Sequence, residues 1–183
     1  LDRAGWLALH APMPASDLLL PGHEDDARAL FALLHHGLPE GAVWTPALAR
    51  PALRCPGRAQ GRLLGGNLSL LAALCGTPWQ PRADGRLLFI EDVSESLYRV
   101  DRLLLQLGQA GLLDAATGFV LGSFTESDDP LPVLQDHLGQ LGKPVLGGWP
   151  AGHGTPNRAL PMGVLATLDA DAGSLRFDQP VLV

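Results

Sequence analysis

Apolar residues recur along the chain as short continuous runs that alternate with helical stripes. The runs Gly85–Glu91 and Gly118–Phe124 have the length and composition of strands that are covered on both faces. Between them, Ser96–Gly111 carries leucine and valine at helical spacing and arginine and glutamine on the other side, which predicts an amphipathic helix. A further helix is predicted over Leu131–Leu141 and a further strand over Pro144–Gly147. Alternation of this kind indicates an α/β fold.

The N-terminal part shows similar patterns. Trp6–His10 predicts a short buried strand, which the following prolines end. Glu24–Gly37 predicts a helix, with acidic residues in its first turn and two histidines before the closing glycine. Within this range Ala27, Leu30, Phe31 and Leu34 repeat at helical spacing, which supports the helix. Leu1–Ala4 runs into Gly5 like the last turn of a helix, so we expect the chain to open inside an element of a longer protein.

A change of composition suggests two units. Residues 38–61 are dense in Pro, Gly, Ala and Arg with little periodicity, which predicts an extended linker. We therefore assign residues 1–54 to the remainder of an N-terminal α/β domain with its linker, and residues 55–183 to a C-terminal domain.

The second unit begins with a strand-turn-helix pattern and ends in strands. Asn67 is the expected N-cap of a short helix whose inward residues are Leu68, Leu71 and Leu74. The tail predicts strands joined by tight turns, over Val164–Asp169, Ser174–Phe177 and Pro180–Val183. The C-terminal tail is thus expected to be rich in β structure.

Composition excludes several classes of function. With 183 residues, 46% apolar residues and a net charge of -6, the chain can bury a core and has no basic stripe for nucleic acid. No apolar run is long enough to span a bilayer, so we expect no membrane partner. Cys55 and Cys75 lie in no CxxC pair and have no His at metal-ligand spacing, so we expect neither metal nor cofactor.

Two residues stand where α/β proteins place their chemistry. Glu91 ends a buried strand, at the sheet edge where ligand crevices form, although a solvated acid or a helix cap is an alternative. His153 lies between two glycines in a loop, although a lone exposed loop histidine is the commoner case. A Glu and a His on separate loops can serve as the carboxylate and the base of a catalytic triad.

The third member of a triad, a nucleophile, is not apparent. The chain contains no G-x-S-x-G elbow, and Ser69 falls inside a predicted helix. Four other serines lack the flanking glycines of a strained turn: Ser94, Ser96, Ser123 and Ser127. The remaining histidines are weaker candidates than His153, and His10 and His23 are placed beside turns.

Four ordered motifs resemble the LD-carboxypeptidases, serine peptidases of murein recycling that include the microcin-immunity peptidases. They are Gly-Gly-Asn67-Leu-Ser, Leu-Phe-Ile-Glu91-Asp-Val-Ser-Glu, Gly-His153-Gly and Leu160-Pro-Met-Gly. His10-Ala-Pro-Met also resembles a family element that usually reads His-Gly-Pro-Met. The resemblance covers about residues 61–177.

The resemblance implies a fold and catalytic residues. The family fold is an N-terminal flavodoxin-like domain followed by a swivelling α/β domain. The catalytic Glu and His carry over to Glu91 and His153, with Glu95 and then Asp92 as alternative carboxylates. We expect Gly65, Gly66 and Asn67 to bind substrate. The family's nucleophilic Ser follows an N-terminal strand and should lie upstream of this chain.

The resemblance also implies a substrate. Family members hydrolyse the bond to the terminal D-alanine of murein tetrapeptides in the cytoplasm, without a cofactor, and the resemblance suggests a homodimer. Two alternatives remain open: a microcin-immunity-type peptidase acting on a peptide-nucleotide, and a non-catalytic module that binds muropeptides or docks on a separate N-terminal half.

Overall fold

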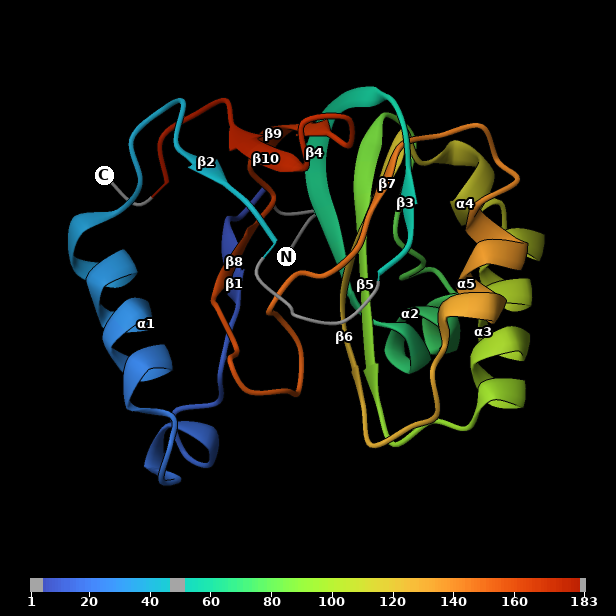
Figure 1. The fold of residues 1–183 in the computed structure, drawn as a ribbon. Coiled ribbons are helices and arrows are strands. Elements are labelled where there is room, and N and C mark those ends of the chain that lie inside the picture. Colours follow the sequence, from blue (N-terminus) through green and yellow to red (C-terminus); the bar gives the residue numbers. More distant parts are fainter. Residues whose placement is uncertain (1–4, 47–51, 182–183) are drawn as a thin grey trace.

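The computed structural model describes residues 5–46 and 52–181, which form a mixed α/β structure around a curled eight-stranded sheet (Figure 1). The strand order is β2-β10-β9-β4-β5-β6-β7-β3. Its parallel centre consists of β4 (Arg58–Asn67), β5 (Arg86–Val93), β6 (Gly118–Thr125) and β7 (Val145–Leu146). Antiparallel strands flank it: β2 (Val43–Trp44), β3 (Arg54–Cys55), β9 (Leu165–Asp169) and β10 (Ser174–Phe177).

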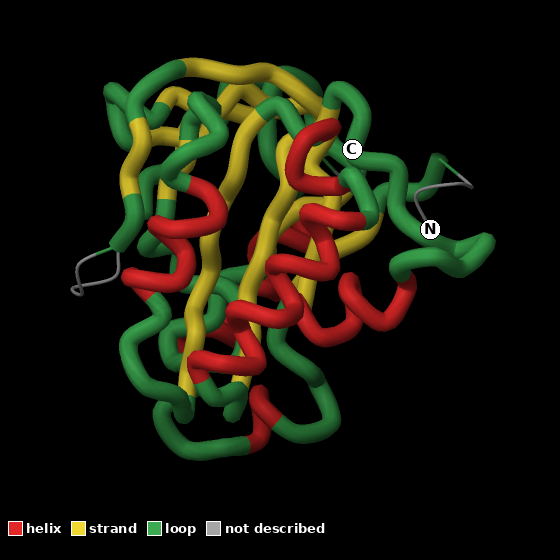
Figure 2. The backbone as a smooth tube through the Cα atoms, turned by 90° about the vertical axis from the view of Figure 1, so that its right-hand side faces the viewer, coloured by secondary structure: helices red, strands yellow, loops and turns green. Residues whose placement is uncertain are grey.

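Four helices cover one face of this sheet (Figures 1 and 2). They are α2 (Leu68–Leu74), α3 (Leu97–Gln109), α4 (Leu112–Ala115) and α5 (Leu131–Leu138). Because side chains alternate along a strand, Leu88 and Ile90 of β5 point into the core beneath these helices, whereas Leu87 and Phe89 point to the other face. There they join a second core that also holds Phe177.

The N-terminal elements lie beside the second core. β1 (Ala8–His10) pairs antiparallel with β8 (Leu160–Met162) in a separate two-stranded sheet. The 3-10 helix η2 (Asp17–Leu19) leads to α1 (Glu24–His36), which stands on the opposite side of the molecule from α3 and α5 (Figure 1). None of the helices in the described ranges is long and apolar enough to cross a membrane.

Most predicted elements are present, and the mixed α/β class and the β-rich tail are confirmed. The apolar residues of α1 lie on two faces of the helix: Leu30 and Leu33 are buried, whereas Phe31 and Leu34 are 61% and 51% exposed. The helix packs on a small cluster around Ala159, and that contact selects one apolar stripe over the other. Leu74 of α2 was predicted to face inward, but it is 36% exposed.

One boundary prediction also differs, and two others lie partly or wholly outside the described residues. Residues 38–61, predicted as a linker, contain β2, β3 and the start of β4, because each finds a strand partner elsewhere in the sheet. In the predicted strand 180–183, Val181 pairs with Leu38 in an isolated bridge. Residues 182–183 lie outside the described residues, as does the predicted helix end at Leu1–Ala4.

Candidate active site

Glu91 and His153 meet in the structure. Glu91 lies inside β5 and not after it, because the strand continues to Val93. Alternation puts it on the same face as Leu87 and Phe89, and no part of it is exposed. His153 comes from the loop after β7, and its Nδ1 lies 2.8 Å from Oε2 of Glu91. Half of the His153 side chain is exposed, so the ring's other nitrogen remains available for chemistry.

Gly152 makes this contact possible. It has φ +132°, and a Cβ there would lie 2.5 Å from Oγ of Ser123 and 2.7 Å from Oε2 of Glu91. Only glycine tolerates both the backbone conformation and this closeness. The loop is anchored at Ala151, whose carbonyl accepts hydrogen bonds from the backbone N–H and the hydroxyl of Ser123. The His153 loop therefore lies directly against the carboxylate.

Burial dominates the electrostatics of Glu91. Loss of water raises the pKa of its carboxyl above the ordinary value, although the hydrogen bond and charge of His153 oppose the shift. Its Oε1 has no hydrogen-bond partner in the described part of the chain, and Nε2 of His10 lies 3.7 Å away. Burial, and then the nearby His153, lowers the pKa of His10. His10 thus lies beside the oxygen of Glu91 that has no hydrogen-bond partner among the described residues.

The two alternative carboxylates are engaged elsewhere. Asp92 accepts hydrogen bonds from Nδ2 of Asn67, at 2.7 Å, and from the backbone N–H and hydroxyl of Ser69. Glu95 accepts from the Ser69 hydroxyl and pairs with Arg99 at 2.6 Å. Of the three carboxylates considered from sequence, Glu91 is the one that contacts His153.

The predicted substrate-binding segment borders the same place. Asn67 is the N-cap of α2, as expected, and its Oδ1 accepts from the N–H of Leu70. A Cβ on Gly65 would clash with the backbone of Phe89, so this glycine is required for β4 and β5 to approach. Gly66 also has positive φ and lies beside the ring of His10. The segment lies in the strand next to Glu91, where Asn67 is the paired residue, and its contact with substrate stays a prediction.

Sequence reasoning missed three residues near this pair. His10 was placed beside a turn, although its motif with Pro12 and Met13 already suggested a family element. Asp26 was counted only as a charge in the first turn of a helix, and Asn157 was not singled out. Both are buried and bonded to the His153 loop, and no local sequence signal marks such a contact.

The described serines do not complete the pair. Ser123 lies against Gly152 and Gly154, but its hydroxyl donates to the carbonyl of Ala151 and its side chain is buried. Ser69 lies at the start of α2, and its hydroxyl donates to the carboxylates of Asp92 and Glu95. Neither arrangement resembles a nucleophile hydrogen-bonded to an imidazole.

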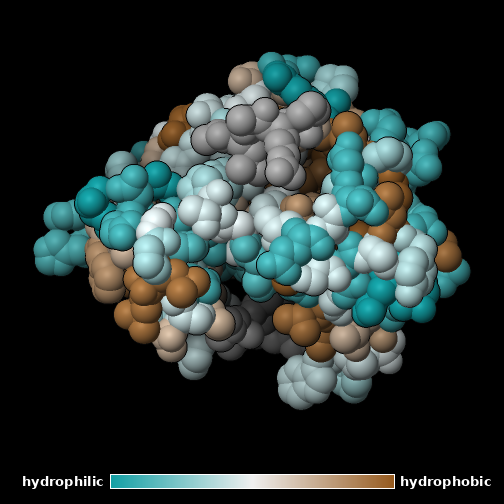
Figure 3. Space-filling view, turned by 60° about the horizontal axis from the view of Figure 1, so that its bottom comes forward, coloured by the Kyte–Doolittle hydropathy of each residue, from teal (hydrophilic) through white to brown (hydrophobic). Residues whose placement is uncertain are grey.

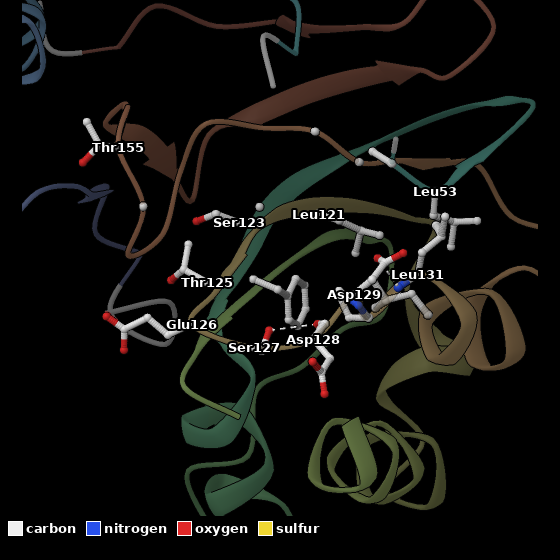
Figure 4. Close-up of a pocket in the computed structure, with 18 of the residues that line it drawn as sticks. Leu53, Leu121, Ser123, Thr125, Glu126, Ser127, Asp128, Asp129, Leu131 and Thr155 are labelled. Carbon is white, nitrogen blue, oxygen red and sulfur yellow. Dashed lines mark hydrogen bonds between the residues drawn. The ribbon is translucent and has the colours of Figure 1, made fainter. Parts of the chain in front are cut away.

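A pocket of about 540 Å³ borders the His153 loop. Figure 4 shows Thr155 at one end, near Ser123 and Thr125, and Leu53 and Leu131 at the other. The described ranges contain no group of three or more His, Cys, Asp or Glu that could hold a metal ion. Cys55 and Cys75 are both free.

Comparisons with known proteins show which family the chain resembles. A family described as the LD-carboxypeptidase C-terminal domain matches residues 60–168. A carboxypeptidase candidate of Synechocystis sp. is 45% identical over 191 residues, covering 97% of this chain. The muramoyltetrapeptide carboxypeptidase of Oxalobacter formigenes has a TM-score of 0.76 at 32% identity over 96% of the chain. The microcin C7 self-immunity protein, known from Escherichia coli, has a TM-score of 0.83 at 25% identity over all of it.

This chain is shorter than those proteins. It spans 58% of the length of the Synechocystis relative and 63% of each of the two solved chains.

Proposed function

The chain belongs to the LD-carboxypeptidase family, and from this we propose that it supplies the base and the orienting carboxylate of a serine-type LD-carboxypeptidase. The proposed substrate is a murein tetrapeptide, and the proposed product is free D-alanine. The nucleophilic Ser would belong to a part of the protein outside this chain. The observation that carries the proposal is the 2.8 Å contact between Nδ1 of His153 and a fully buried oxygen of Glu91.

In the proposed mechanism, Glu91 accepts a hydrogen bond from Nδ1–H of His153 and leaves Nε2 free to take a proton. The Ser hydroxyl attacks the carbonyl before the terminal D-alanine, and His153 removes its proton. His153 then gives that proton to the leaving amine, and an acyl-enzyme forms. Water, deprotonated by His153, hydrolyses the acyl-enzyme. Throughout, Glu91 stabilises the imidazolium and fixes the ring.

The test is release of D-alanine from murein tetrapeptide by the protein at the full length its source produces. Substituting Glu91→Gln or His153→Ala should lower kcat by roughly 10³- to 10⁴-fold. The first substitution removes the carboxylate that orients the base and stabilises the imidazolium, and the second removes the base itself. A folded variant whose turnover equals that of the unchanged protein would remove the assignment. Glu95→Gln is the matched control, since Glu95 contacts Ser69 and Arg99 instead of His153.

A second candidate is a microcin-immunity-type peptidase that acts on a peptide-nucleotide. It is favoured by the likeness to the microcin C7 self-immunity protein over the whole chain. That protein has been solved in complex with aspartyl sulfamoyl adenosine, so the same assay should include this compound. Cleavage of it in preference to the murein tetrapeptide would select this candidate. Binding of muropeptide without cleavage by the full-length protein would instead indicate a non-catalytic module.

We also propose the family's organisation for this protein. Residues 1–54 would complete an N-terminal flavodoxin-like domain, and residues 55–183 would form the swivelling domain. A cytoplasmic location and a homodimer are proposed from the family resemblance.

A further inference from the structure

We propose that Asn157 and Asp26 are positioning residues that keep the ring of His153 within hydrogen-bonding distance of Glu91. This inference rests on the proposed function, in which His153 must keep Nε2 unprotonated. It begins with two hydrogen bonds that join one side chain to both sides of Gly152. The amide Oδ1 of Asn157 accepts from the N–H of Gly152 at 3.2 Å, and Nδ2 donates to the carbonyl of Gly152 at 2.6 Å.

These two hydrogen bonds restrict backbone rotation at Gly152. Gly152 is the direct neighbour of His153, and glycine has the largest conformational freedom of any residue. Because both peptide groups next to Gly152 are held by one amide, the backbone cannot rotate there without breaking at least one bond. Asn157 is only 3% exposed, so water does not readily replace either partner.

Asp26 holds Asn157 in turn. Its Oδ2 accepts from the backbone N–H of Asn157 at 2.9 Å, and its side chain is 2% exposed. Two basic groups lie near this carboxylate: Nδ1 of His23 at 3.5 Å and Nε of Arg158 at 4.0 Å. A buried carboxylate costs free energy unless it is well bonded, and Oδ1 of Asp26 has no hydrogen-bond partner in the described ranges. Its place in the fold is therefore better explained by the loop it holds than by stability.

His23 adds a second tie between the same two segments. Its Nε2 lies 3.1 Å from Oγ1 of Thr155. The start of α1 is thus bonded to the loop at two points, on the side of His153 opposite to the anchor that Ser123 provides at Ala151. With both ends of the loop tied, the imidazole is presented to Glu91 at a fixed distance.

The test is the tautomer of His153 in this chain, read from ¹⁵N chemical shifts of the ring at a pH where it is neutral. The signals are assigned as those missing from His153→Gln. In the unchanged chain, Glu91 should keep the proton on Nδ1. Asn157→Ala and Asp26→Ala should move the Nδ1 signal toward that of an unprotonated nitrogen, because the ring leaves Glu91. Asp26→Asn keeps an acceptor oxygen and should restore the original signal.

Two further variants separate the possible failures. Val100→Ala removes fully buried contacts on the far face of the sheet, and should lower thermal stability without moving the His153 signal. If Glu91→Ala moves the signal but Asn157→Ala and Asp26→Ala do not, the positioning role is wrong and the proposed function stands. If Glu91→Ala also leaves it unchanged, the Glu91–His153 pair itself fails.

Discussion

At the scale of single residues, the candidate site is built around a carboxylate that is buried away from water. Glu91 has no exposed surface, and only its Oε2 has a hydrogen bond, to His153, among the described residues. Burial disfavours the charged form and raises the pKa of Glu91. Its contribution to stability is therefore fully present below the ordinary pKa of 4.5 and is lost as the pH rises through the folded pKa.

Glu91→Gln should accordingly stabilise this chain at pH 8, although it should lower the proposed activity of the full-length protein. The neutral amide avoids burial of a charge, so we expect a gain on the order of 1 kcal/mol, or about 2–4 °C in Tm. The gain should shrink as the pH falls toward 4.5 and below, where the native carboxyl also becomes neutral. Thermal unfolding of both proteins from pH 4 to pH 8 measures the effect. Glu40→Gln, at an exposed position, is the control and should show no such gain.

At the scale of elements, the start of α2 shows how a local rule can be overruled by a neighbour. Asn67 caps the helix through Oδ1 and donates through Nδ2 to the buried Asp92. Aspartate is as good an N-cap as asparagine, and the helix dipole favours negative charge there. Judged by the helix alone, Asn67→Asp should thus be harmless.

Asn67→Asp should instead destabilise the chain by roughly 1–3 kcal/mol, because it removes a donor to a buried carboxylate and replaces it with a like charge. The shift of the urea midpoint at pH 7 measures the loss. Ser96→Asp is the matched control: it adds an acid at the exposed N-cap of α3 and should change stability by less than about 0.5 kcal/mol. Equal stability of Asn67→Asp and the unchanged chain would show that the Asp92 contact contributes nothing.

The difference between local signals and distant contacts also explains which features of the elements the sequence could predict. β5 was recognised because Leu87–Ile90 is apolar without a break, yet its end was misplaced because Glu91 looks like the start of a loop. A carboxylate can continue a buried strand here because His153, 62 residues away, bonds it. The span of α1 was likewise predicted from its ends, whereas its buried stripe depends on Ala159. Local signals thus define elements, and distant contacts define their faces and limits.

The site follows this rule too. Glu91 and His153 could be singled out from the sequence because each lies within a recognisable motif. Asp26 and Asn157 could not be found from local pattern, because the bond that joins them spans 131 residues. His10 lies in a motif, but its place beside Glu91 depends on the fold.

At the scale of the whole molecule, the proposed division between residues 54 and 55 is crossed by many contacts. β1 pairs with β8, β2 with β10 and β3 with β7, and the rings of Trp44 and Phe177 pack edge to face at 5.0 Å. Figure 3, which looks at the lower end of the molecule, shows apolar side chains on either side of a hollow. The division into two domains remains a prediction, and the contacts across it favour unfolding of both segments together.

We therefore expect this chain to unfold in one transition, with equal calorimetric and van't Hoff enthalpies. Phe177→Ala tests the coupling, because Phe177 is fully buried and contacts Trp44 across the proposed division. The substitution should lower stability by about 3–5 kcal/mol and shift the fluorescence and circular dichroism transitions together. Val43→Ala, at a position 55% exposed on the same strand as Trp44, should have little effect. Two resolved transitions, with only one moved by Phe177→Ala, would mean that the segments before and after the proposed division fold independently despite the strands that join them.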